Sequence, residues 1–178
     1  AEYGYTACIL AMFEKLNLQQ QAKLLKTKDK SGNTALLLAA QYGHVNLITS
    51  ILENQDNQQI CSLLNVQNNV GDTTSMIATE NTKKTYFNFI NKKLNAQQII
   101  SLLSIKNNGG DTALIFSAES TSTECITVMC KKLNAKQIKG LAEIKNDNEK
   151  TAFISAILHG HSQWLNFIFS RLTSKEIH

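Results

Sequence analysis

The chain lacks several features that define other protein classes. Its 178 residues include no proline, which favours uninterrupted helices and argues against a proline-rich linker or ligand. The longest apolar run is the short stretch from Ala35 to Ala40, whereas a membrane-spanning helix needs about 18 such residues or more. The first residues lack the basic and apolar zones of a signal peptide, and there is no starting methionine. We therefore expect a trimmed piece of a protein without a membrane span.

The sequence also lacks the cysteine spacing and the clusters of basic residues that mark other protein classes. The 4 cysteines (Cys8, Cys61, Cys125 and Cys130) show no C-x-x-C spacing. This excludes a disulfide-stapled secreted scaffold and predicts reduced thiols in a cytosol-like compartment. The net charge of +4 is modest, and the basic residues do not gather into the dense patch of a nucleic-acid binder. The composition predicts a cytoplasmic protein that binds no nucleic acid.

One sequence phrase recurs throughout the chain. Thr34, Thr73, Thr112 and Thr151 lie at intervals of 39 residues, and all but the last follow a Gly-Asn or Gly-Asp pair. An internal repeat of this length predicts a stack of similar structural units. We expect a single array of about four and a half units, with boundaries at 1–28 (partial), 29–67, 68–106, 107–145 and 146–178 (partial).

Each unit is predicted to hold three helices and one exposed loop. In the unit at 29–67, apolar spacing predicts a first helix from Thr34 to Tyr42 and a second from about Val45 to Glu53. The apolar stripe of the second helix is expected to pack into the core, and its copy in the last unit is Trp164, Leu165, Ile168 and Phe169. The third helix begins with capping-box spacing, in which the first side chain accepts a backbone N–H and the residue three positions later reaches back. This spacing occurs at Asn17…Gln20, Asp56…Gln59, Asn95…Gln98, Asn134…Gln137 and Thr173…Glu176. The fold class is therefore all-α, a helical solenoid with hairpin loops.

The phrase Gly32-Asn33-Thr34-Ala35-Leu36, followed by Gly43-His44, resembles the ankyrin repeat. The family repeat is about 33 residues long and opens with T-P-L-H. Here the unit is longer, and the Pro and His of the opening are replaced by Ala35 and Leu37 in the first full copy. Other helical solenoids with repeats of similar length are a minority alternative. The resemblance implies a non-catalytic module that binds other proteins.

Energetically, the unit at 68–106 is expected to be the weakest. Ser75 occupies the position of Leu36 and Leu114, and Thr74 and Thr79 replace alanines. Replacing a buried large aliphatic side chain by a small one costs roughly 2–4 kcal/mol.

Residues with possible chemistry are better explained by packing. His159 and His161 form an H-x-H pair without a third ligand. Cys8, Cys125, Cys130 and Trp164 fall on expected core positions, whereas Cys61 is expected to be more exposed. No phosphate loop, pair of catalytic carboxylates or Ser/His/Asp set is present. We expect no enzyme activity, no cofactor and no metal.

Cations form a column at the ends of the second helices. Lys15, Lys93, Lys132 and Arg171 share one position in the repeat, with Lys92 and Lys131 beside it. Such a ridge is able to contact phosphates or an anionic lipid surface. The favoured interpretation is that these cations meet the negative end of the helix dipole.

By resemblance, ankyrin arrays bind partners on a concave surface made of hairpin tips and the exposed face of the first helix. The predicted contact residues in this chain are Lys30, Ser31, Asn33, Gln41, Tyr42, Asn69, Val70, Asp72, Glu80, Asn81, Asn108, Asp111, Glu119, Ser120, Asp147, Lys150 and His159. Asp72, Glu80, Asp111 and Glu119 make the middle of this surface acidic, so a basic or polar protein segment is the expected partner of a monomeric array.

Two functions fit these observations. The first is a protein-interaction module. Its Lys-, Asn- and Ile-rich composition resembles arrays of intracellular bacteria, in which such proteins often act as effectors secreted into the host cell cytoplasm. The alternative is a substrate-recruiting domain of a larger enzyme whose catalytic part lies outside this chain. Sequence beyond residues 1 and 178 discriminates between the two.

Overall fold

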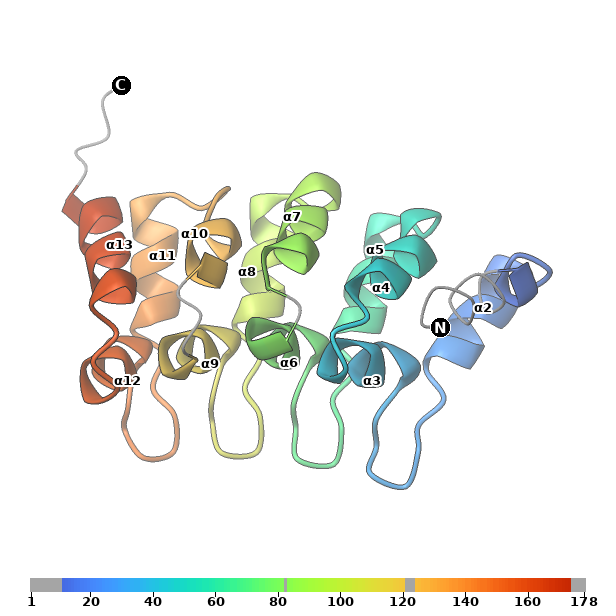
Figure 1. Ribbon diagram of the computed structural model, residues 1–178, viewed down its shortest axis with the longest axis horizontal. Helices are drawn as coiled ribbons and strands as arrows, with labels where there is room; N and C mark the ends of the chain where they lie inside the picture. The colour runs from blue at the N-terminus through green and yellow to red at the C-terminus, as the bar shows by residue number, and fades with distance from the viewer. Residues whose placement is uncertain (1–10, 82, 121–123, 174–178) are drawn as a thin grey trace.

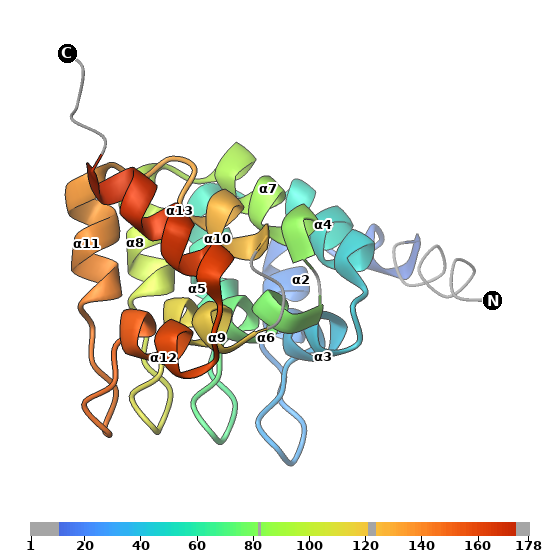
Figure 2. The ribbon, with the colours of Figure 1, turned by 60° about the vertical axis from the view of Figure 1, so that its left-hand side comes forward.

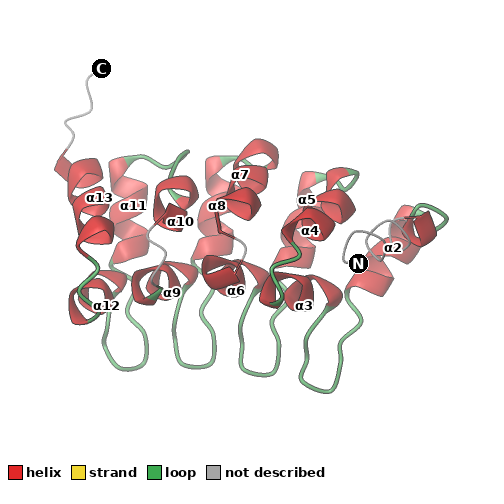
Figure 3. Ribbon diagram, in the orientation of Figure 1, coloured by secondary structure: helices red, strands yellow, loops and turns green. Residues whose placement is uncertain are grey.

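The computed structural model describes residues 11–81, 83–120 and 124–173, except the side chains of residues 80, 81, 83 and 124. All regular secondary structure in these ranges is helical (Figure 3), which confirms the all-α solenoid. The helices are α2 (Leu18–Leu25), α3 (Ala35–Gln41), α4 (Val45–Glu53), α5 (Asn57–Leu64), α6 (Thr74–Asn81), α7 (Lys83–Lys93), α8 (Ala96–Leu103), α9 (Ala113–Glu119), α10 (Glu124–Met129), α11 (Ala135–Ala142), α12 (Ala152–Leu158) and α13 (Ser162–Thr173).

The helices stack in rows of equivalent copies. The first helices α3, α6, α9 and α12 each contact the next, as do the second helices α4, α7, α10 and α13. The third helices α2, α5, α8 and α11 form another row, and the loops before the first helices all project to one side (Figure 1). Figure 2 shows the same order of rows from a second direction. Neighbouring copies therefore supply the surface against which each unit packs.

Polar side chains define where the helices begin. Thr34, Thr112 and Thr151 cap the first helices, each accepting the N–H of the residue three positions on. Reciprocal capping boxes are present at Asn17, Asn95 and Asn134, as predicted. At Asp56 only half of the box forms: the carboxylate accepts from Gln59 N at 2.8 Å, but Gln59 Oε1 is buried without a partner. The predicted box at 173–176 lies outside the described residues.

Serine and aromatic side chains pair in the core. Ser75 Oγ lies 2.9 Å from the hydroxyl of Tyr86, and both side chains are buried. The Trp164 indole N–H likewise donates to Ser117 Oγ at 3.1 Å. The polar residue at position 75 therefore has a partner, and the Tyr86 ring fills the space beside it. This pairing offsets part of the cost that the sequence alone assigns to Ser75.

The last unit departs from the expected core pattern. Trp164 and Ile168 of α13 are buried as predicted, but Phe169 is 50% exposed. The equivalent residues Leu52 and Cys130 are fully buried because the next unit covers them. No described unit packs against that side of α13, so the prediction of a core position for Phe169 is wrong.

Candidate protein-binding surface

The loops before the first helices have one shared construction. They cover residues 29–33, 68–72, 107–111 and 146–150, and each is closed by a hydrogen bond from the N–H of its first residue to the carbonyl of its fifth. The side chain of the first residue, Asp29 or an asparagine, also accepts from the third and fifth backbone N–H groups. Asp or Asn at this position recurs every 39 residues, a signal that the sequence analysis did not use.

Backbone hydrogen bonds join each loop to the next. Asn69 N donates to Ser31 O, Asn108 N to Val70 O, and Asp147 N to Gly109 O, each at 3.0 Å. The loops therefore form a hydrogen-bonded stack and hold fixed positions relative to one another.

Side chains reinforce this stack. Asn68 Nδ2 donates to Asn33 Oδ1 at 3.1 Å and Asn107 Nδ2 to Asp72 Oδ1 at 2.9 Å. Asn146 Nδ2 completes the series with Asp111 Oδ1 at 2.7 Å. Asp72 and Asp111 are thus half-buried structural acceptors as well as acidic groups on the surface.

Glycine is required where one loop touches the next. Gly110 has a φ of 78°, in the left-handed region, and a Cβ there would lie 2.7 Å from Asp147 N. Gly32 and Gly71 have the same conformation and equally close neighbours. At the fourth copy, Glu149 adopts a φ of 59° without being glycine. For a non-glycine residue this conformation costs about 1–2 kcal/mol.

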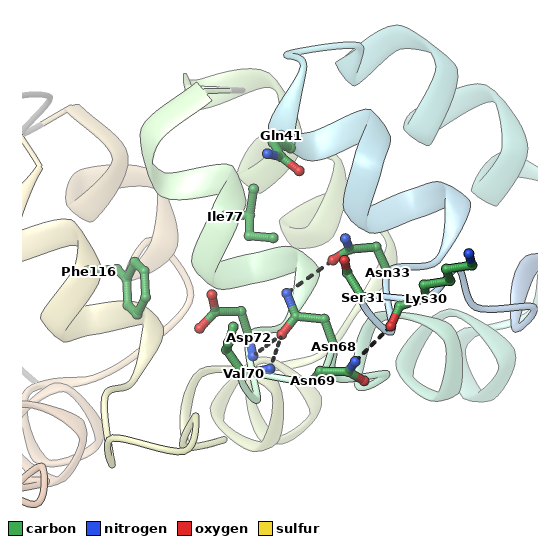
Figure 4. A pocket seen from close by; sticks show the side chains of 10 residues that line it. All are labelled: Lys30, Ser31, Asn33, Gln41, Asn68, Asn69, Val70, Asp72, Ile77 and Phe116. Carbon is green, nitrogen blue, oxygen red and sulfur yellow. Dashed lines mark hydrogen bonds between the residues drawn. The ribbon is translucent and has the colours of Figure 1, made fainter.

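A hollow of about 500 Å³ lies between the first two of these loops and the first helices. It is lined by Lys30, Ser31, Asn33, Gln41, Asn68, Asn69, Val70, Asp72, Ile77 and Phe116 (Figure 4). Seven of these ten residues were predicted as contact residues, and Asn68, Ile77 and Phe116 were not. The structure brings polar loop tips and apolar helix residues together at one site.

The other predicted contact residues extend along the same two elements. Tyr42, at the end of α3, is 69% exposed. Glu119 is exposed, and its Oε1 accepts a hydrogen bond from Ser155 Oγ at 3.1 Å. Exposed positions at the loop tips are held by Asn108, Asp147 and Lys150. Glu80 and Asn81 belong to α6, and their side chains are outside the described residues. Ser120 is half-buried at the end of α9.

The histidines at the end of α12 have structural partners. His159 Nδ1 lies 2.9 Å from Ser155 O, and His161 Nδ1 lies 2.8 Å from Ala118 O in the preceding unit. The described residues contain no group of three or more His, Cys, Asp or Glu side chains able to hold a metal ion. The His159 imidazole therefore contacts a carbonyl of its own unit, and the His161 imidazole contacts a carbonyl of the preceding unit.

The described cysteines behave as packing residues. Cys125 and Cys130 are buried as predicted, and desolvation raises the pKa of the Cys130 thiol to about 12. Cys61 is half-buried, and its burial raises the thiol pKa. The raised pKa values keep the Cys61 and Cys130 thiols protonated and unreactive near neutral pH. Cys8 lies outside the described residues.

The cation column forms a ladder between units. Lys93 Nζ donates to Glu53 O at 2.6 Å, Lys132 Nζ to Leu94 O at 2.8 Å, and the Arg171 guanidinium to Leu133 O at 2.5 Å. Glu53 is the last residue of α4 and Leu94 directly follows α7, whereas Leu133 lies in the turn between α10 and α11. Lys93 and Lys132 thus meet a helix end, but the helix belongs to the preceding unit. A basic ridge held by these bonds is less available to phosphates.

The family model of the ankyrin repeat matches residues 31–69, one repeat length that includes α3, α4 and α5. The fold is that of an ankyrin repeat array. No curated protein matches the chain. Ankyrin repeats are in general non-catalytic protein-interaction modules. The described helices include none long and apolar enough to cross a membrane.

Proposed function

We propose that this ankyrin array binds a segment of a partner protein on its loop–helix surface, which comprises the four loops and the exposed faces of α3, α6, α9 and α12. The hollow of about 500 Å³ carries this proposal, because a recess lined by both polar and apolar groups is typical of binding sites. The hydrogen-bonded loop stack supports it, since a surface that is already ordered loses little entropy on binding.

Available side-chain groups support the same surface. Tyr42 presents an exposed ring beside the hollow's Gln41, and buried aromatic anchors contribute much of the energy at interfaces. Glu119 and Asp147 present exposed carboxylates on the third and fourth units of the same surface. A basic or polar segment complements them, and such charge pairing mainly affects association rate and selectivity.

The test needs variants that leave the loop stack intact. Reversing the charge of Asp72 or Asp111 removes an acceptor that the next loop uses, so that change confounds binding with stability. Tyr42→Ala combined with Glu119→Lys changes exposed side chains of the loop–helix surface and keeps every hydrogen bond of the loop stack, and it removes only the acceptor of Ser155 Oγ. Glu143→Lys is a matched control on the third-helix side, also exposed and also paired with one neighbouring side chain.

We expect affinity capture with the intact array to recover partner proteins that the Tyr42→Ala/Glu119→Lys variant loses and the Glu143→Lys variant retains. Equal recovery by all three proteins contradicts the proposed surface. Circular dichroism of each variant establishes that the fold is unchanged.

The cellular setting is a further part of the proposal. The Lys-, Asn- and Ile-rich composition supports a bacterial effector that acts in the host cell cytoplasm, and we propose that the array acts there as a monomer. The alternative, a substrate-recruiting part of a larger enzyme, uses the same surface. A translocation reporter fused to the chain separates the two, because an effector carries the reporter into the host cell.

A further inference from the structure

An apolar row runs along the array beneath the loops. Leu38, Ile77 and Phe116 occupy one position of the repeat on α3, α6 and α9, and all three are half-buried. Ile77 and Phe116 line the same hollow although they belong to different units (Figure 4). At the fourth copy the row ends in Ser155, which is buried. The row therefore offers equivalent apolar contact points at successive units.

The distance between units matches the rise of an extended chain. Packed helices lie about 8–10 Å apart, and α3, α6 and α9 are packed neighbours. A polyproline-II segment is extended, advances about 3.1 Å per residue and has three residues per turn, so three residues span about 9 Å and bring the side chain back to the same face. A segment that runs along the array places every third side chain at an equivalent point on the next unit.

Carboxylates beside the apolar row also recur once per repeat. Asp72 and Asp111 each use Oδ1 to accept from the following loop. In the described part of the chain, neither Oδ2 has a hydrogen-bond partner. Val70, 57% exposed, lines the hollow with Asp72. Apolar and acidic contact points thus alternate with one common period.

We infer that the partner segment is extended in a polyproline-II-like conformation and carries apolar side chains three residues apart, with Lys or Arg at the same three-residue spacing. This inference rests on the proposed function of the loop–helix surface. The apolar side chains contact Ile77 and Phe116, and the basic side chains contact the Oδ2 atoms of Asp72 and Asp111. Lys30 at the first loop and Lys150 at the last limit the basic stretch to the middle of the array.

A random twelve-residue peptide library displayed against the 178-residue chain provides the test. We expect the enriched peptides to share apolar residues at positions i and i+3 and basic residues at that spacing. The best of them, made synthetically, is then compared with a peptide of equal composition whose apolar residues stand four apart. We expect the second peptide to bind at least tenfold more weakly.

Matched variants assign the binding to the row. Ile77→Thr is expected to weaken the peptide at least tenfold and Ile100→Thr, a half-buried isoleucine on α8, less than twofold. If Ile77→Thr does not fold, exposed Val70→Lys replaces it, with exposed Leu18→Lys as its control. Both Lys variants preserve the packed core, so one of the two pairs yields a measurement.

The outcomes separate the inference from the proposed function. Enriched peptides with another spacing that still depend on Ile77 overturn the three-residue rule and support the surface. Peptides that bind every variant equally overturn both. A selection that enriches nothing overturns the inference, because a short extended segment is its stated ligand, while capture of folded partners continues to test the function.

Discussion

The unit at 107–145 and the last unit share their repeat positions and differ in burial. Ile115 is fully buried, whereas its equivalent Ile154 is 41% exposed. Ala118 is also buried, and its equivalent Ile157 is 53% exposed. The two units form the same helices, so the difference comes from the neighbour: α12 covers α9, and no described helix covers the far side of α12. Position in the repeat sets the direction of a side chain, and the next unit decides whether it is buried.

Truncating the two equivalent isoleucines gives the largest expected contrast. Ile115→Ala should lower the free energy of unfolding by about 2–5 kcal/mol, because it removes transfer energy and leaves a cavity between α9 and its neighbours. Ile154→Ala should cost about 1 kcal/mol, since much of that side chain already contacts water. Urea unfolding followed by circular dichroism measures both.

The comparison requires that the slope of the unfolding free energy against urea concentration is the same in both variants and in the unaltered chain. A repeat array loses cooperativity when one interface weakens, and this slope then changes. Equal losses for the two variants contradict the explanation from burial by a neighbour. A stabilised Ile154→Ala variant contradicts it as well, since that side chain is only partly exposed.

The loops provide a second contrast of intermediate size. Gly110→Ala should lower the free energy of unfolding by about 2–3 kcal/mol, because Cβ meets the backbone of Asp147 and the left-handed φ is strained. Glu149→Gly should raise it by about 1 kcal/mol, because it relieves the same φ at the last loop. Thermal unfolding of both variants measures these opposite changes in stability.

Glu149 also pairs with Lys145 at 2.6 Å on the surface. Lys145→Ala isolates the contribution of that pair, which at an exposed site is less than about 1 kcal/mol. A Glu149→Gly variant that is less stable than the Lys145→Ala variant shows that relief of backbone strain does not outweigh the other effects of the substitution.

Local sequence patterns predicted the helices because their causes are local. The first and second helices of the unit at 29–67 begin and end within one residue of the prediction, since capping and apolar spacing are read within a few residues. The contact residues were predicted from their positions in the repeat, and seven of them line the hollow.

Features that depend on two distant residues were missed. Asn107 contacts Asp72 across 35 residues, and Ile77 reaches the hollow only because α6 packs beside α3 and α9. Ser75 looked destabilising until Tyr86 was placed beside it. Such pairs require the angle between units, which no single repeat encodes.

A single hydrogen bond tests how the last unit is held. Ser117 replaces the alanine found at the equivalent positions Ala39, Ala78 and Ala156, and its hydroxyl accepts the indole N–H of Trp164 on α13. Ser117→Ala therefore fits sterically but leaves a buried donor unpaired, at a cost of about 1–2 kcal/mol. Trp164 is the single tryptophan, so its emission reports this interface alone.

In the Ser117→Ala variant, the emission of Trp164 should shift to the red at a lower urea concentration than in the unaltered chain. The far-UV circular dichroism of the remaining units should move less, because they lie on the other side of the weakened contact. In a Trp164→Phe background, followed by far-UV circular dichroism because no tryptophan remains, the same substitution should cost nearly nothing, since the donor is gone. A full cost in that background would show that Ser117 acts through packing within α9, and the contrast between inner and last units would then need another cause.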